Sequence, residues 1–342
     1  AGLSLGTLAA QTVTTSWEGN FMLGLMQDWP LLCHRIIDHA ATDHPDRAVI
    51  SRSVEGPLHT TNYANVRKRA LRVAQQLERA GIKPGDRVAT LAWNTWRHLE
   101  CWYGILGIGA IYHTVNPRLF PEQIAWIVNH AEDRVMMTDL TFVPLLEKLA
   151  DKLPTIERYV VLTDAAHMPK TSLKNAVPYE EWIGEVDDDF AWKSFDENTA
   201  AGMCYTSGTT GKPKGVQLTH ANFLSECGNV VNGAADLFLK PNGSTLLFLP
   251  VAHVFGRMVQ IGAIYAGLHM AHCADVQGRL MQDLASFKPT FVLAVPRIFE
   301  KVYNGAEAKA EAAGKGNIFR KAAATAIKYS EAMDSGKISP AL

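Results

Sequence analysis

Residues 87–138 alternate between segments with strand character and segments with helix character, and this rhythm constrains the fold more than any other feature. The strand-like segments are rich in β-formers, and the helix-like ones carry apolar residues at helical spacing. Thr95 is a candidate helix cap, and Pro121 stands where a first helical turn tolerates proline. The expected elements are a strand over 87–92, a helix over 95–106, a strand over 110–114, a helix over 121–131 and a strand over 134–138. Such alternation predicts an α/β fold with mostly parallel sheets covered by helices.

The second half of the chain continues this pattern after a polar interruption. Residues 165–198 are polar and acidic, with Asp187–Asp189 at their centre, and predict a solvated surface connection. The later elements that we expect are strands over 200–205 and 215–220, a helix over 221–235, a strand over 245–249, and a helix over 300–333 that is broken at 314–316.

The run Tyr205–Gly215 spells YTSGTTGKPKG and separates two of these strands. It holds four Ser and Thr hydroxyls, three glycines and two lysines. Glycines let backbone N–H groups approach a ligand closely, hydroxyls add donors, and lysines add positive charge. This combination favours a strand-to-strand loop that covers a polyphosphate. A solvated Gly/Ser/Thr turn is the alternative, which the two lysines and the flanking strands disfavour.

Two commoner phosphate motifs do not fit the spacing. A Walker loop needs four residues between its glycines, whereas two residues separate Gly208 from Gly211, and Pro213 follows Lys212. The dinucleotide fingerprint fails as well, because Gly104, Gly107 and Gly109 do not match G-x-G-x-x-G.

The run Tyr205–Gly215 resembles the phosphate loop of the adenylate-forming (AMP-binding) enzymes, among them the medium- and long-chain fatty acyl-CoA synthetases. The resemblance extends from about Trp29 to the end of the chain. It includes segments similar to the family at 60–66, 85–89, 109–119, 249–257 and 288–301. It implies the large N-terminal domain of the adenylate-forming fold, incomplete at its C-terminus.

The resemblance implies roles for the residues of the phosphate loop. Lys214 matches the lysine of the family motif and is a candidate catalytic residue, whereas Lys212 stands at a position that the motif leaves open. Thr206 resembles the residue whose hydroxyl contacts Mg²⁺ between the phosphates. The backbone and hydroxyls of the loop would hold the phosphates of ATP, and the candidate nucleotide-binding residues are Thr206, Ser207, Gly208, Thr209, Thr210, Gly211 and Lys212.

The segment from Leu249 to Arg257 resembles the floor of the family's acyl pocket. His253 is the second candidate catalytic residue, because it could donate a hydrogen bond to a carboxylate and orient it toward phosphorus. Val254, Phe255 and Arg257 are candidate substrate-binding residues. Ordinary core packing remains the alternative for His253, Val254 and Phe255.

The implied function is a fatty acid–CoA ligase, which converts a medium- or long-chain fatty acid and MgATP to an acyl-adenylate and then to acyl-CoA. ATP, Mg²⁺ and coenzyme A are the implied cofactors and co-substrates. Aryl or amino acid activation, luciferase-like chemistry, and a non-catalytic nucleotide-binding module remain alternatives. The segment Val295–Lys301 and the apolar pocket floor favour the fatty acid.

We expect an N-terminal extension over 1–28, a first α/β subdomain over 29–199, and a subdomain carrying the phosphate loop over 200–342. The family's small C-terminal domain, its Tyr-Gly-x-Thr-Glu segment and its late catalytic lysine are not found in the sequence. We therefore expect that these 342 residues alone cannot complete thioester formation.

Composition narrows the class of protein further. With 33 basic and 34 acidic residues, the chain has no electrostatic footprint for nucleic acid. Its five cysteines are scattered in apolar runs and predict free, buried thiols in a reducing compartment. The longest apolar stretch, Cys101–Tyr112, is too short to cross a bilayer. We expect a cytoplasmic enzyme, and leave open a homodimer and peripheral association with the inner membrane face to collect fatty acid.

Overall fold

The computed structural model describes residues 29–206, 212–276 and 278–336. Its larger sheet, here called sheet B, has the strand order β7-β6-β5-β3-β4-β8-β9. Neighbouring strands run parallel except β8 and β9, which are antiparallel. The strands are β3 (Arg87–Leu91), β4 (Ile111–Thr114), β5 (Val135–Thr138), β6 (Arg158–Val161), β7 (Val177–Pro178), β8 (Ala200–Thr206) and β9 (Lys214–Thr219).

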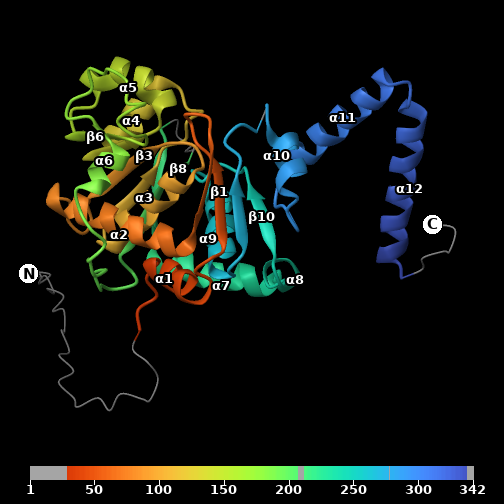
Figure 1. The fold of residues 1–342 in the computed structure, drawn as a ribbon, viewed down its shortest axis with the longest axis horizontal. Helices are drawn as coiled ribbons and strands as arrows, with labels where there is room; N and C mark the ends of the chain where they lie inside the picture. The colour runs from red at the N-terminus through yellow and green to blue at the C-terminus, as the bar shows by residue number, and fades with distance from the viewer. Residues whose placement is uncertain (1–28, 207–211, 277, 337–342) are drawn as a thin grey trace, which may run out of the picture.

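A second, four-stranded sheet, sheet A, has the order β10-β11-β1-β2. Strands β1 (Ala48–Arg52) and β2 (Leu58–Asn62) form an antiparallel hairpin near the start of the chain. Strands β10 (Ser244–Leu247) and β11 (His269–His272) come about two hundred residues later, and β11 pairs in parallel with β1. In Figure 1, β1 and β10 stand to the right of β3 and β8 of sheet B.

The largest hydrophobic core joins one face of sheet B to sheet A through several helices. Among them are α1 (His34–Asp43), α2 (Tyr63–Arg79), α3 (Trp96–Gly107), α7 (His220–Gly233) and α9 (Val254–Tyr265). Every residue of α3 is buried, and α3 makes its closest packing with α2. Its start is capped as predicted, because the Thr95 side chain accepts a hydrogen bond from the His98 backbone N–H at 3.4 Å.

A second core covers the opposite face of sheet B. Alternate strand residues supply the two cores: Val88 faces the first, whereas Ala89 and Leu91 face the second. The covering elements are α4 (Pro121–Ala131), α5 (Val143–Leu149) and the 3₁₀ turns Leu140–Phe142 and Ala150–Lys152. Sheet B is thus buried on both faces, as the sequence rhythm predicts for a parallel sheet.

The predicted surface connection over 165–198 is wrong in part. It contains strand β7 and helix α6 (Tyr179–Gly184), whose Tyr179, Trp182 and Ile183 are buried in the first core. These apolar residues are few and closely spaced within an acidic stretch, so composition concealed them. The acidic run 187–189 does lie at the surface or partly exposed, as predicted.

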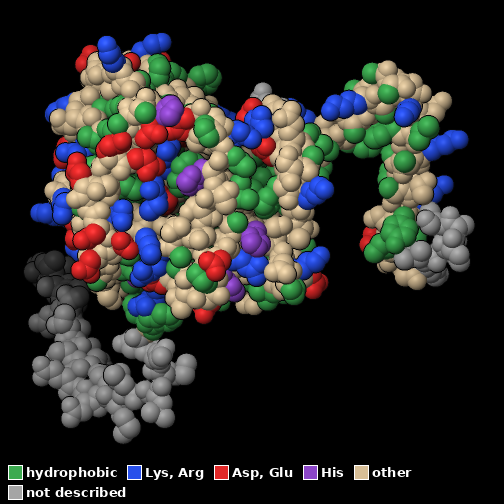
Figure 2. All heavy atoms as spheres, in the orientation of Figure 1, with side chains coloured by type: hydrophobic (Ala, Val, Ile, Leu, Met, Phe, Trp, Pro, Cys, Tyr) green, Lys and Arg blue, Asp and Glu red, His purple; other side chains and the backbone are tan. Residues whose placement is uncertain are grey.

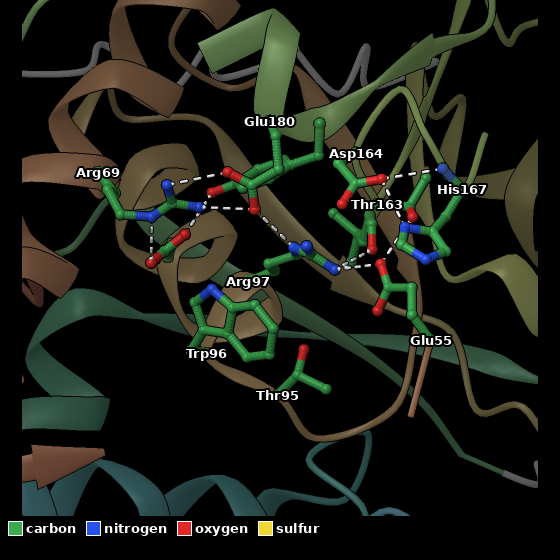
Figure 3. A network of polar contacts seen from close by, with 12 residues as sticks. Glu55, Arg69, Thr95, Trp96, Arg97, Thr163, Asp164, His167 and Glu180 are labelled. Atoms are coloured by element: carbon green, nitrogen blue, oxygen red, sulfur yellow. Dashed lines mark hydrogen bonds and ion pairs between the residues drawn. The ribbon is translucent and has the colours of Figure 1, made fainter. Parts of the chain in front are cut away.

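Helix α6 also supplies Glu180 to a cluster of paired charges (Figure 3). Arg97 of α3 lies between two carboxylates, 2.8 Å from Glu55 of the β1–β2 turn and 2.7 Å from Glu180. Arg69 of α2 bonds Glu180 at 3.0 Å and the fully buried Glu100 at 2.8 Å. We call Glu55, Arg69, Arg97, Glu100 and Glu180 the ionic cluster; it ties the hairpin of sheet A to three helices around sheet B.

The remaining helices are α8 (Ala235–Phe238), α10 (Leu280–Phe287), α11 (Pro296–Ala312) and α12 (Gly316–Asp334). The predicted break in the last long helix is confirmed. Helices α11 and α12 project from the body and pack on each other through Tyr303 and Phe319, whose ring centroids lie 5.2 Å apart (Figure 1). Hydrophobic and basic side chains both lie along this arm, and acidic and basic ones are interspersed over the body (Figure 2).

The remaining expectations concern the cysteines, membrane-spanning helices and the boundary between the two predicted subdomains. All five cysteines are free thiols, four of them buried and Cys204 half-buried, as predicted. Within the described residues, no helix combines the length and apolar character needed to cross a bilayer. The division at residue 199 stays a prediction; β8 and β9, which follow it, complete the edge of sheet B.

Candidate functional site

The carboxyl ends of the parallel strands of both sheets meet around one pocket, which is where α/β folds commonly bind ligands. Segments after β3 and β4 line it from sheet B, and segments after β10 and β11 line it from sheet A. Its volume is about 30 Å³, the room of one water molecule. The lining residues are Ala92, Trp93, Asn94, Thr114, Pro117, Arg118, Phe248, Pro250, Val251, Ala252, Cys273, Ala274 and Val276.

The stem of the predicted phosphate loop ends at the same edge of sheet B. Strands β8 and β9 pair Tyr205 with Gly215 and Thr206 with Lys214, so the loop is a strand-to-strand connection as predicted. Thr206, Lys212 and Lys214 are exposed. Five predicted phosphate-binding residues, Ser207, Gly208, Thr209, Thr210 and Gly211, lie outside the described residues.

The predicted pocket-floor segment turns directly into helix α9. His253 precedes the first helical residue, and its backbone N–H donates to the Pro250 carbonyl at 3.0 Å. Gly256 allows this close turn, because a Cβ there would lie 2.5 Å from the Pro250 oxygen. The side chains of His253, Val254 and Phe255 are exposed, Val254 by 50% and Phe255 by 45%. They are therefore not ordinary core residues.

Arg257, one turn further along α9, is placed differently. It is 3% exposed and points among neutral hydrogen-bond partners rather than into solvent. One Nη donates to the Tyr112 hydroxyl at 2.9 Å and to Thr114 at 3.4 Å, while the other donates to Gln260 at 2.5 Å. The guanidinium also lies 5.1 Å from the ring centroid of Trp102. Within the described part of the chain, no carboxylate forms an ion pair with it.

The partners of Arg257 belong to a larger buried group. Tyr112 bonds His98 and Thr90, and His272 of β11 bonds Ser51 of β1 at 2.8 Å and Gln260 at 3.4 Å. Burial and, to a smaller extent, the nearby Arg257 charge lower the pKa of both His98 and His272 to about 3. Both imidazoles are therefore neutral at physiological pH. We call Thr90, His98, Tyr112, Arg257, Gln260 and His272 the neutral cluster.

Two contacts beside the pocket connect its walls. The Asn94 side chain donates to the Leu249 carbonyl at 2.9 Å, which joins the end of β3 to the pocket floor. Asp139 accepts from the Trp93 backbone N–H at 2.6 Å. Burial raises the pKa of Asp139 to about 7, although that hydrogen bond opposes the shift.

Sequence reasoning did not single out Trp93, Asn94 and Thr114 as site residues. Their position in the sequence could have identified them, because each is a polar or aromatic residue at or just after the end of a predicted parallel strand. The ends of such strands gather at one edge of a sheet, where ligands commonly bind. His220, His269 and His272 accept or share hydrogen bonds with Cys33, Ala48 and Ser51 respectively.

A magnesium ion has a simple potential ligand at this edge. The described residues contain no group of three or more His, Cys, Asp and Glu side chains that could hold a metal. Thr206, however, is exposed at the end of β8 and faces Lys214 across the ladder. One hydroxyl suits Mg²⁺ bound with a nucleotide, since this ion keeps several waters and needs few protein ligands.

Comparison with known proteins identifies the family. Residues 37–333 match the family described as AMP-binding enzyme. The chain belongs to the AMP-binding enzymes. The resemblance inferred from the phosphate-loop motif is therefore confirmed.

Curated relatives of this AMP-binding chain are CoA ligases. A 3-methylmercaptopropionyl-CoA ligase of Ruegeria pomeroyi is 38% identical over 84% of the chain and 54% of its own length. A medium-chain fatty acid–CoA ligase of Ectopseudomonas oleovorans is 35% identical over 82% of the chain and 51% of its length. A long-chain fatty acid–CoA ligase of Thermus thermophilus is 38% identical over 71% of the chain and 43% of its length. The chain spans about half the length of these relatives.

Solved structures agree on the fold. An anthranilate CoA ligase in complex with anthranoyl-AMP superposes with a TM-score of 0.69 at 21% identity, covering 83% of this chain and 52% of that one. A putative long-chain fatty acid CoA ligase from Rhodopseudomonas palustris gives 0.68 at 21% identity, covering 80% and 65%. The AMP-binding chain thus has the predicted α/β fold of the large domain of adenylate-forming acyl-CoA ligases.

Proposed function

We propose that this chain is the ATP- and acid-binding part of a fatty acid–CoA ligase that acts on medium- or long-chain acids. The observation that carries the proposal is the exposed pair Thr206 and Lys214, at the same sheet edge as the pocket whose floor leads to His253. The names of the Ectopseudomonas and Thermus relatives support the acid class.

In the proposed first reaction, a carboxylate oxygen of the acid attacks the α-phosphorus of ATP. The bond between that phosphorus and the oxygen bridging to the β-phosphate breaks, and pyrophosphate leaves. Lys214 and Lys212 would neutralise charge on the outer phosphates, and residues Ser207–Gly211 would donate hydrogen bonds to them. His253 would orient the attacking carboxylate, since its exposed ring has no hydrogen-bond partner among the described residues.

Magnesium, held in part by Thr206, would screen the charge of the phosphates when it is bound with ATP. Val254 and Phe255 would contact the acyl chain, because they are large apolar side chains exposed beside His253. Arg257 would act from beneath them as a buried positive charge near the reacting carboxylate. In the second reaction, the thiolate of coenzyme A would attack the acyl carbonyl and AMP would leave.

Binding of MgATP to the purified chain tests the nucleotide site. We expect Lys214→Ala and Thr206→Ala to weaken binding in calorimetry by about 10- to 100-fold each, since a hydrogen bond to a charged group is worth about 1.5–3 kcal/mol. Lys68→Ala, an exposed lysine on α2, is the matched control and should bind like the wild type. Unchanged affinity in the first two variants would overturn the proposal.

Acid-dependent exchange of pyrophosphate into ATP tests the acid class. We expect exchange with fatty acids of medium or long chain to exceed exchange with aryl acids, amino acids or 3-methylmercaptopropionate. The last acid is included because the Ruegeria relative is named for it. MgATP binding without exchange for any acid would favour a non-catalytic nucleotide-binding module. The cytoplasmic location, the homodimer and the peripheral membrane contact remain proposals that fractionation and sedimentation can test.

A further inference from the structure

We propose that Trp126, His130, His113 and Asp133 are positioning residues for ATP, which act through Tyr205 on the loop stem formed by Thr206 and Lys214. The inference rests on the proposed nucleotide site. It assigns a function to a group of side chains that neither the phosphate-loop motif nor the pocket floor includes.

Helix α4 holds Tyr205 from the solvent side. The Tyr205 hydroxyl lies 2.7 Å from Nδ1 of His130, in the last turn of α4. The ring of Trp126, one turn earlier, stacks on His130 with centroids 4.6 Å apart and meets Tyr205 edge-on at 6.1 Å. Burial raises the pKa of Tyr205 to about 12, so the phenol keeps its proton and can donate it to the imidazole. These contacts fix both the ring plane and the hydroxyl of Tyr205.

A buried pair supports Tyr205 from inside the sheet. His113 of the neighbouring strand β4 lies with its ring centroid 5.1 Å from that of Tyr205. Its Nδ1 is 2.6 Å from Asp133, and both side chains are fully buried. Asp133 lies two residues after the end of α4. The end of this helix and the residues that follow it therefore hold both His130, beside Tyr205, and His113, below it. An imidazole locked by a buried carboxyl group offers a rigid surface for packing.

The ring of Tyr205 also reaches across to the second strand of the stem. Gly215 is its partner on β9, and a Cβ on Gly215 would lie 3.3 Å from the Tyr205 ring. The ring therefore packs over the backbone of β9 at the residue next to Lys214. A shift of Tyr205 would move both residues of the stem. Thr206 follows Tyr205 on β8, and Lys214 precedes Gly215, the partner of Tyr205, on β9.

The position of Tyr205, Trp126 and His130 favours a role in alignment over a role in stability. Tyr205 and Trp126 are only half-buried, and His130 is exposed. Antiparallel pairing of β8 and β9 ends at Thr206 and Lys214, where the ladder itself gives the least support. Displacing a binding group by as little as about 1 Å can cost about 100-fold in rate, so a contact that aims the stem can matter more for ligand binding than for folding.

Three substitutions test whether the hydrogen bond between Tyr205 and His130, rather than the size of these side chains, aligns the loop stem. Tyr205→Phe removes the hydroxyl and keeps the ring. His130→Asn keeps an amide oxygen that can accept this hydrogen bond near the position of Nδ1, whereas His130→Gln moves the amide away. We expect Tyr205→Phe and His130→Gln to raise the dissociation constant of MgATP about 3- to 10-fold in calorimetry, and His130→Asn to stay near the wild type. The thermal unfolding midpoint should change by no more than a few degrees in all three.

Hydrogen exchange gives a second readout. Segments 200–206 and 214–219 should exchange faster in Tyr205→Phe than in the wild type, while β3 and β5 stay unchanged. His167→Gln is the control, because His167 makes a similar 2.7 Å contact with Asp164 at an exposed position. It should leave both MgATP affinity and exchange unaltered.

The outcomes are distinguishable. If the wild type binds MgATP and Tyr205→Phe and His130→Gln bind it equally well, the positioning inference is wrong and the proposed nucleotide site stands. If His130→Asn loses as much affinity as His130→Gln, the hydrogen bond is not responsible, and the inference is again overturned. If the wild type does not bind MgATP, the proposed function fails and the inference fails with it.

Discussion

Helix α3 borders two buried polar clusters, and their arginines have different kinds of partner. On one side, Arg97 and Arg69 of the ionic cluster are paired with three carboxylates (Figure 3). On the other side, Arg257 of the neutral cluster is surrounded by hydroxyl, amide and aromatic groups. Arg97 and Arg257 are both shielded from solvent. The side chain of Arg97 is 9% exposed, and the whole residue Arg257 is 3% exposed.

The difference separates a structural role from a candidate functional one. A cation paired with buried carboxylates is already neutralised, and it joins sheet A to helices α2, α3 and α6. A buried cation without a carboxylate retains its field, and Arg257 lies one turn from His253, where the substrate carboxylate would react. The ionic cluster therefore contributes to stability, while the neutral cluster would keep positive potential available at the edge of the proposed site.

The largest effect on stability should come from breaking the ionic cluster. Arg97→Met leaves the Glu55 carboxylate, 4% exposed, without its cation, and it removes one partner of Glu180. We expect a loss of about 3–5 kcal/mol in the free energy of unfolding, because a buried charge is left unpaired. Urea unfolding at pH 7 measures it. Arg320→Met, which breaks an exposed pair between α12 and Glu311 of α11, should cost less than about 1 kcal/mol; equal losses would contradict the comparison.

Removing the cation of the neutral cluster should cost less. Arg257→Met leaves no carboxylate behind, and the Tyr112 hydroxyl keeps Thr90 and His98 as partners. We expect a loss of about 1–3 kcal/mol, the usual range for a buried donor or acceptor left unsatisfied. The same urea titration tests this value. A loss larger than that of Arg97→Met would mean that Arg257 is the more important structural cation.

The neutral cluster should make the fold sensitive to acid through its histidines. Because the pKa of His272 is lowered from 6.5 to about 3, the unfolded chain binds a proton below pH 6.5 that the folded chain does not. This residue's stabilisation is therefore present above pH 6.5 and falls by about 1.4 kcal/mol per pH unit as the pH drops toward 3.

His272→Asn keeps a polar atom toward Ser51 but cannot titrate. We expect its free energy of unfolding to fall less steeply than that of the wild type between pH 6.5 and pH 4.5, when both are measured in urea. Parallel curves for the two proteins would show that His272 takes up its proton equally in the folded and unfolded states.

The smallest effect concerns the start of the helix that the two clusters share. Thr95→Ala removes the cap of α3, and we expect a loss of about 1 kcal/mol. Thr95→Ser retains the hydroxyl and should lose less than half of that amount. The thermal unfolding midpoint measures both variants. If Thr95→Ala cost as much as Arg97→Met, the junction between the clusters, rather than their charges, would dominate stability.

Local signals in the sequence predicted the elements that lie close together along the chain. Strands β3, β4 and β5, helices α3 and α4, and the stem of β8 and β9 fall where periodicity and turn residues placed them. Helix α6 was missed, because its buried side chains are short apolar interruptions in an acidic stretch. The pairing of β1 with β11 was not predictable either, since no local pattern links Val49 to Met270.

The candidate site divides in the same way. The run Tyr205–Gly215 predicts a phosphate loop through its own composition, and the segment ending at Arg257 predicts the pocket floor through resemblance; both roles stay predictions. The exposure of Phe255 and the burial of Arg257, two residues apart, could not be predicted, because their directions depend on which side of α9 faces sheet B.

The amino-acid sequence by itself determined the rhythm of strands and helices, the loop chemistry and the family, because these depend on neighbours a few residues apart. Tertiary structure alone decided which charges are paired and which is not, and it brought His113, Asp133 and His130 around Tyr205. The physical reason is that hydrogen bonds and ion pairs form between groups that burial of apolar faces brings together, however far apart those groups lie along the chain.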